Sequence, residues 1–293
     1  MKSGWKQDAA ELVRALKQER AVAVFGLCGI SLEDQHRAFQ LARALGASVS
    51  VRRALLPTTT FGALSRYRLI LSSGCTQGVP LPSNARLLTD ERLNSAETWR
   101  NLRILQRGHT TAEAESLRAL YEQIVEAEGA AFLLCQDDVS EELKTELMSF
   151  CAECALPTGL DYLQATDCLN MLGAYETALE EASGAHASFA GGAEYPNDAF
   201  ALEELLENGA LGAALLIGDA AGQEEQVLKA GVPLYSIGSA VPGAVQSIPA
   251  ELQCKGGTVL RSDGLPVRVA VSGQSGLIPI SEVLETMIAE ARA

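Results

Sequence analysis

The sequence is poor in aromatic and basic residues. Its 293 residues include only 2 Trp, 6 Tyr and 7 Phe, so Ala, Leu and Val must fill most of the core. The 23 Lys and Arg are outnumbered by 37 Asp and Glu, which gives a net charge of -14, and no basic cluster interrupts the acidic balance. Because nucleic-acid-binding surfaces carry basic patches, we expect no nucleic-acid partner.

The sequence also lacks a long hydrophobic run. The uncharged stretch 232–250 contains Pro233, Pro242 and Pro249, which favours strand and loop over a membrane-spanning helix. Charged residues throughout the first twenty positions leave no apolar core for a signal peptide. We therefore expect a cytoplasmic protein with no membrane partner.

Short apolar segments of strand length alternate with helical patterns along most of the chain. The expected strands are 21–27, 48–51, 68–72, 86–89, 131–135, 213–217 and 232–237, with 102–105 as a weaker candidate. Helices with one apolar face separate them, and Ser31 and Ser140 are candidate N-caps. This alternation predicts an α/β fold with mainly parallel sheets covered by helices.

The C-terminal residues depart from this alternation of strands and helices. Segments 258–261 and 265–271 flank the turn sequence Ser262-Asp263-Gly264, which predicts a C-terminal antiparallel ribbon. Apolar residues at helical spacing from Ser281 onward predict a final packing helix.

Glycines and aspartates follow several expected strands. Gly26 and Gly29 lie between a strand and a capped helix, where a dinucleotide phosphate could bind, but the full G-x-G-x-x-G pattern is absent. Gly218 and Gly222 are similar, and we favour steric roles for all of them. For the strand-end aspartates, helix capping is the commoner role; they are Asp90, Asp137 and Asp219.

The seven cysteines are odd in number and irregular in spacing, which indicates buried thiols more than a disulfide framework. Cys151 and Cys154 form a C-x-x-C, but a helix would bury both, and no second pair completes a zinc site. Cys28 and Cys75 lie in expected loops and are better candidates for reactive thiols.

The three histidines form no metal-ligand spacing. His36, His109 and His186 are far apart in the chain, and no nucleophile elbow, phosphate-binding loop or kinase signature is present. Local motifs therefore assign no catalytic, cofactor-binding or metal-binding residue.

Longer segments resemble one family. Residues 256–268 read GGTVLRSDGLPVR and resemble the stretch G-G-T-x-x-R-x-D-G-x-P-x-R in the B-type subunit of formylmethanofuran dehydrogenase, a molybdopterin oxidoreductase. Segments 202–219 and 278–284 are similar to the same subunit, as is 26–31 together with the helix ending at Ala47. Asn170-Met171-Leu-Gly173 resembles its G-N-M-x-G run.

The departures from that family concern its redox centre. The family's N-terminal cysteine cluster has no counterpart before Cys28, and its metal-ligating C-H-G-P turn falls on Ala54-Leu55-Leu56-Pro57. Alanine cannot ligate molybdenum or tungsten. The family's S-R-G-Y-P-R stretch falls on 189–194, which contains no arginine.

This pattern is similar to the B-type subunits of bacterial formyltransferase/hydrolase complexes, cofactor-free relatives of the dehydrogenase subunit. The resemblance implies a non-catalytic scaffold in one-carbon metabolism, in a complex that converts a formyl-tetrahydromethanopterin-type carrier to formate through a methanofuran-type carrier. It implies no cofactor in this chain, with the metal in a partner amidohydrolase subunit. A formyltransferase subunit and a small further subunit would be the other partners.

The family topology also implies two Rossmann-like lobes, the second inserted into the first. We expect 1–55 with 200–293 to form the first lobe and 56–199 to form the second. Two alternatives remain open: a stand-alone nucleotide-binding α/β enzyme, and a residually active pterin-dependent dehydrogenase subunit.

Overall fold

The computed structural model describes residues 4–74, 79, 81–135, 139–154, 156–157, 159–165, 170–220, 222–252, 257–261, 264–268 and 277–293. The chain forms two compact units. The first comprises Met1–Arg52, Cys168–Arg261 and Pro266–Ala293, and the second comprises Arg53–Asp167 and Ser262–Leu265. Each unit contains its own sheet and its own hydrophobic core.

The first unit contains an eight-stranded sheet among its described residues, in the order β14-β11-β10-β9-β1-β2-β7-β8. Neighbours from β14 to β2 pair in parallel, whereas β7 runs antiparallel to β2 and β8 antiparallel to β7. The strands are β1 (Val22–Gly26), β2 (Ser48–Ser50), β7 (His186–Ser188), β8 (Tyr195–Pro196), β9 (Ala213–Gly218), β10 (Leu234–Gly238), β11 (Gln246–Glu251) and β14 (Ile278–Pro279). A separate antiparallel ribbon pairs β12 (Thr258–Leu260) with β13 (Pro266–Arg268).

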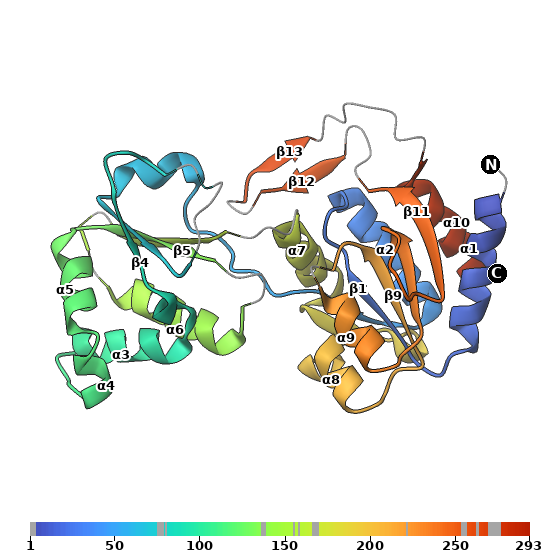
Figure 1. Ribbon diagram of the computed structural model, residues 1–293, viewed down its shortest axis with the longest axis horizontal. Helices are drawn as coiled ribbons and strands as arrows, with labels where there is room; N and C mark the ends of the chain where they lie inside the picture. The colour runs from blue at the N-terminus through green and yellow to red at the C-terminus, as the bar shows by residue number, and fades with distance from the viewer. Residues whose placement is uncertain are drawn as a thin grey trace. The chain divides into compact units, whose positions relative to one another are not determined.

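Helices cover both faces of the large sheet (Figure 1). One layer contains α1 (Gly4–Gln18), α2 (Leu32–Leu45), α7 (Met171–Ala182) and α10 (Ile280–Arg292). The other contains α8 (Leu202–Glu207) and α9 (Gln223–Lys229), which pack on Ala23 and Phe25 of β1. Short 3-10 turns precede α8 at Ala190–Gly192 and Asp198–Phe200.

The boundaries of α2 follow from local chemistry. The Ser31 side chain accepts a hydrogen bond from the Asp34 N–H, and Gly46 ends the helix in the left-handed conformation with φ of 64°. These are the two end signals that the sequence carries at Ser31 and Gly46.

Over its described residues, the second unit contains a four-stranded parallel sheet in the order β4-β3-β5-β6. Its strands are β3 (Leu69–Ser72), β4 (Arg86–Thr89), β5 (Ala130–Leu134) and β6 (Leu160–Gln164). Its helices are α3 (Ala96–Gln106), α4 (Ala112–Glu115), α5 (Arg118–Glu126) and α6 (Glu141–Glu153), with 3-10 turns η1 (Phe61–Arg66) and η2 (Glu91–Asn94).

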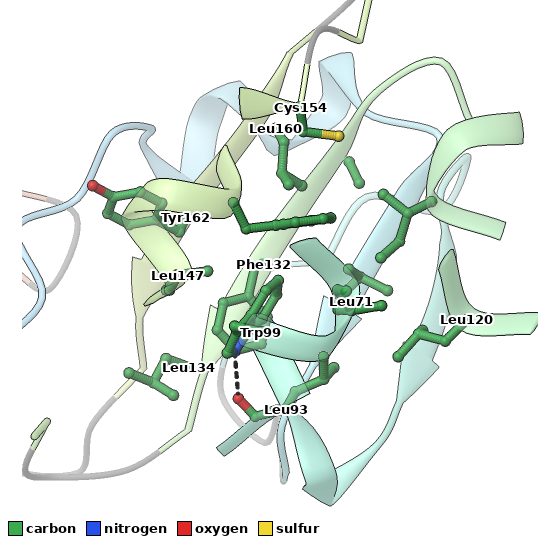
Figure 2. Packing of buried hydrophobic residues seen from close by; sticks show 14 of the residues in the cluster. Leu71, Leu93, Trp99, Leu120, Phe132, Leu134, Leu147, Cys154, Leu160 and Tyr162 are labelled. Carbon is green, nitrogen blue, oxygen red and sulfur yellow. Dashed lines mark hydrogen bonds between the residues drawn. The ribbon is translucent and has the colours of Figure 1, made fainter. Parts of the chain in front are cut away.

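Trp99 lies at the centre of the core of the second unit (Figure 2). It is fully buried, its indole N–H donates a 2.9 Å hydrogen bond to the Leu93 carbonyl, and its ring centroid lies 4.7 Å from that of Phe132 and 5.5 Å from that of Phe150. Three of the few aromatic side chains are thus gathered in one place, in geometries that favour ring pairs.

Ion pairs join the outer faces of α3 and α6. Arg103 bonds Glu146 and Glu153, each at 2.6 Å, and Arg107 bonds Glu153 at 2.7 Å. Hydrogen bonds from Arg107 and Arg103 lower the pKa of Glu153 to about 2. The Arg107–Glu153 pair is accessible to solvent and stabilises the fold little, whereas the Arg103 and Glu146 side chains are 19% and 15% exposed and form a partly buried pair.

The predicted fold class is confirmed, including the parallel sheets and the antiparallel ribbon. Segments 21–27 and 213–217, which the expected first lobe brings together, pair directly as β1 and β9. The strand expected at 102–105 is wrong: this segment belongs to α3, where Leu102 and Leu105 follow Trp99 at three-residue spacing on its buried face.

The observed division of the chain differs from the expected one in the place of residues 168–199. We expected them in the inserted lobe, but they group with the first unit. The cause is that β7 pairs with β2 and α7 packs on α2. Among the described residues, no helix combines the length and apolar character needed to cross a bilayer.

We expect Trp99→Phe to destabilise the second unit by about 1–3 kcal/mol, because it leaves the buried Leu93 carbonyl without its donor and opens a small void. Urea unfolding followed by far-ultraviolet circular dichroism measures the change. Trp5→Phe, at the partly exposed tryptophan of α1, is the matched control. Equal stability of the Trp99 variant and wild type would contradict the central role of this side chain.

Candidate functional site

The carboxyl end of β1 is the expected ligand position in this topology. The chain runs from β1 to β2 on one side and returns to β9 on the other, and α/β proteins bind ligands at such a switch point. Here the two loops pair with each other. Leu27 N donates to Ile217 O at 2.8 Å, Asp219 N to Cys28 O at 2.9 Å, and Cys28 N to Asp219 O at 3.3 Å.

Two glycines permit this close approach. A Cβ on Gly218 would lie 2.3 Å from the Cys28 carbonyl oxygen, and a Cβ on Gly26 would lie 2.9 Å from the Asp219 carbonyl oxygen. Both residues also have positive φ, of 82° and 89°. The steric role that we favoured for the glycines is what the geometry at these two positions shows.

A buried polar network extends from this loop to α7. Asn170 is 3% exposed and precedes α7 in the left-handed conformation, with φ of 58°. Its Nδ2 donates to Ile30 O at 2.6 Å, and its Oδ1 accepts from Leu260 N of β12 at 2.7 Å. Gln35 Nε2 donates to Leu27 O at 2.9 Å and to Asn170 O at 3.3 Å. We call these residues, with Thr177 bonded to Gln35, the Asn170 network.

The run Asn170-Met171-Leu-Gly173 has a physical explanation in this network. A Cβ on Gly173 would lie 2.1 Å from Asn170 Oδ1 and 2.8 Å from Leu32 Cδ2. Only glycine therefore lets the Asn170 side chain fold over the first turn of α7 and reach the ribbon.

Glu33 and Asp34 complete this end of the sheet. Glu33 accepts hydrogen bonds from Thr258 N and Oγ1, both at 3.0 Å; burial favours a higher pKa for Glu33, but the bonds from Thr258 outweigh it and lower the pKa. Asp34 is almost fully buried, and burial raises its pKa although Ser31 and Arg37 bond its carboxylate. Three segments that resemble the dehydrogenase subunit, at 26–31, 170–173 and 258–260, thus meet here.

A cavity lies beside this closed position, at the carboxyl ends of β9 and β10. Its volume is about 330 Å³. It is lined in part by Asp219, Glu224 and Glu225 together with the loop from Ser239 to Pro242. The lining is acidic, which disfavours a phosphate group.

The metal-ligand position of the dehydrogenase subunit falls on Ala54 in the second unit. Ala54 is 1% exposed and carries no donor atom, and the neighbouring Leu55 N–H donates to Gln164 Oε1 at 2.7 Å. These residues do not fit a molybdenum or tungsten ligand. The stretch 189–194, which takes the place of the family's arginine-bearing stretch, begins with a packing residue: Phe189 lies edge-on against Phe39, with ring centroids 6.4 Å apart.

The cysteines differ in their surroundings. Cys28, one of the two candidates for a reactive thiol, is 1% exposed at the paired loop, and this burial disfavours reactivity because a thiol needs access to react. Cys154 is buried in the core of the second unit and Cys151 packs against it, as predicted, and burial raises the pKa of both thiols. Cys75 lies outside the described residues.

The three histidines and Asp90 take no part in the Asn170 network, whereas Asp219 lies in the paired loop beside it. His36 Nδ1 lies 2.7 Å from Glu181 Oε1, His186 Nδ1 lies 3.1 Å from Ser50 Oγ, and His109 is exposed. Asp90 caps η2 through the Arg92 N–H, as predicted, whereas Asp137 lies outside the described residues. The described residues contain no cluster of three His, Cys, Asp or Glu side chains that could hold a metal ion.

No protein-family profile matches the chain, and no curated protein matches its sequence. Among solved structures, the fold is similar to a chain in the X-ray crystal structure of the formyltransferase/hydrolase complex (FhcABCD) from Methylorubrum extorquens in complex with methylofuran. The TM-score is 0.70 at 17% sequence identity, and the match covers 98% of this chain and 95% of that chain. At this identity the likeness establishes a shared fold across nearly the whole of both chains.

We expect Gly218→Ala to destabilise the first unit by about 2–5 kcal/mol, because the added Cβ meets the Cys28 carbonyl and the positive φ is strained. Gly222→Ala is the matched control, since Gly222 has a φ of 94° but open space around it, and should cost about 1–2 kcal/mol. Chemical unfolding of both variants gives the comparison. Equal losses would show that the loop pairing contributes nothing beyond backbone strain.

We expect Asn170→Asp to place an anion against the Ile30 carbonyl and to destabilise the first unit by about 2–4 kcal/mol at neutral pH. The folded-state pKa of the new carboxyl is then raised above its unfolded value near 3.9, so the deficit relative to wild type shrinks as the pH falls and the neutral acid donates to Ile30 O. Urea unfolding between about pH 8 and about pH 5 measures this difference. Asn170→Gly, which keeps the backbone conformation and removes both bonds, should show a deficit that does not change with pH.

Proposed function

We propose that this chain is a non-catalytic scaffold subunit of a formyltransferase/hydrolase-type complex. The observation that carries the proposal is the structural likeness to a chain of such a complex over 98% of this chain and 95% of that one. A likeness that leaves almost no part of either chain unmatched fits an equivalent place in an equivalent assembly. The sequence segments at 170–173 and 256–268 point in the same direction.

The geometry of the large sheet supports the non-catalytic part of the proposal. The backbone pairing of Cys28 with Asp219 occupies the position where a nucleotide phosphate or a pterin pyrophosphate would need the loop amides. The side-chain amide of Asn170 donates a hydrogen bond to the Ile30 carbonyl and accepts one from the Leu260 N–H. These groups stabilise the chain itself, which disfavours the nucleotide-binding alternative.

The metal-ligand position supports loss of the ancestral redox chemistry. Ala54 offers no ligand, and the adjacent backbone donates to Gln164. We therefore propose that the residually active pterin-dependent alternative does not apply. Under this proposal the chain shares its fold with molybdopterin oxidoreductases but not their redox chemistry.

The proposed partners are an amidohydrolase subunit that holds the catalytic metal, a formyltransferase subunit and a small further subunit. The reaction of the whole assembly would convert a formyl-tetrahydromethanopterin-type carrier to formate through a methanofuran-type carrier, in the cytoplasm. A catalytically empty subunit has a physical role there, because holding two active sites together raises the effective concentration of a tethered carrier.

Co-expression with the three partner subunits tests this function. We expect a stoichiometric complex in native mass spectrometry, and formate release from the formyl carrier that falls when this chain is left out. The purified chain alone should catalyse neither formyl transfer nor hydrolysis. Turnover by the isolated chain, or its elution as a separate species in the presence of all three partners, would refute the proposal.

A further inference from the structure

The two sheets differ in how their edges are protected. The large sheet ends in β8 and β14, two-residue strands that contain Pro196 and Pro279, and proline cannot donate to an added strand. In the second unit, the outer edge of β6 is covered by Thr58. Thr58 N donates to Tyr162 O at 3.0 Å, and Tyr162 N donates to Thr58 Oγ1 at 2.9 Å.

The remaining edge, β4, has no such protection within the described part of the chain. Arg86 N donates to Arg68 O and Asp90 N donates to Ser72 O, so alternate residues from Arg86 bond β3. Leu87 and Thr89 must therefore present their N–H and C=O groups away from the sheet. Both residues are exposed, Leu87 at 42%, and no described group bonds these backbone atoms.

The sequence of this edge is complementary to itself. If a second β4 runs antiparallel with Leu87 opposite Thr89 of the other copy, Arg86 lies opposite Asp90 and Leu88 lies opposite Leu88. Oppositely charged residues then face each other twice across the two-fold axis, and the exposed Leu87 gains a neighbour. Hydrogen bonds to Arg92 lower the pKa of Asp90, so its carboxylate is ionised at neutral pH.

We propose that the β4 edge of the second unit is a docking surface for a second copy of this chain, and that two such edges pair antiparallel to join their four-stranded sheets into one. The pairing uses only the outward groups of Leu87 and Thr89, so the ladder to β3 stays intact. The short strand gives a small contact, and such contacts are weak and depend on protein concentration. This inference does not rest on the proposed function.

The first test measures the mass of the full chain by sedimentation equilibrium over a wide range of concentrations. We expect a monomer–dimer equilibrium in wild type. Arg86→Glu sets two acidic side chains opposite each other and should weaken the dimer about tenfold or more. Arg66→Glu, the same charge change at an exposed residue outside the pairing register, is the matched control and should leave the equilibrium unchanged.

The second test fixes the register. Opposed residues in a pair without backbone hydrogen bonds have Cα atoms about 4.5 Å apart, within the range of a disulfide, whereas diagonal neighbours are too distant. Oxidised Leu88→Cys should therefore form a covalent dimer through position 88, identified by mass spectrometry. Leu87→Cys is the control and should not cross-link to itself.

Thermal unfolding and circular dichroism confirm that each variant folds. A chain that stays monomeric at all concentrations, equal dimerisation of Arg86→Glu and wild type, or cross-linking through position 87 in place of 88 would each overturn the proposal. Dimers that form only through a different partner strand, with no contribution from position 88, would do the same.

Discussion

The side-chain amide of Asn170 holds together the end of the large sheet where α/β proteins ordinarily bind ligands. One amide satisfies the carbonyl of Ile30 and the N–H of Leu260, which belong to segments more than 200 residues apart in the chain. The ribbon of β12 and β13 has only three residues in each strand, too few for independent stability. Its order therefore depends on Asn170 and on the two bonds between Thr258 and Glu33.

The same end of the sheet shows how a ligand site and a closed loop compete for one set of backbone groups. Gly26 and Gly218 have no side chain, so another group can approach their backbone closely. That group can be the phosphate of a ligand or the backbone of the facing loop. Here the Cys28 carbonyl and the Asp219 amide pair with each other. The paired loops therefore hold this end of the sheet in shape without a bound ligand, which suits the proposed scaffold role.

The sequence predicted the elements that carry a strong local signal. The strand expected at 86–89 is β4, and Ser31 and Ser140 cap their helices, because apolar runs and caps are local features. The strand prediction for 102–105 failed because Leu102 and Leu105 fit either a short strand or one face of a helix. The three-residue spacing from Trp99 is what indicates the helix. The Asn170 network could not be derived from spacing, since its partners come from distant segments; the nearby Gly173 was the one local sign of a close approach.

Both units bury aromatic residues, but the two units group them differently. The second unit packs three aromatic side chains into one core, those of Trp99, Phe132 and Phe150. The short, exposed strand β4 packs against this core through Leu88. In the first unit, Ala23 and Ala214 are paired neighbours at the centre of the sheet, and small side chains there allow α8 and α9 to pack closely. Backbone pairing closes the carboxyl edge of the first unit, whereas at β4 the outward backbone groups bond no residue that the structure describes. Backbone groups of that kind must bond water, a side chain or another strand, and a second strand can satisfy all of them at once.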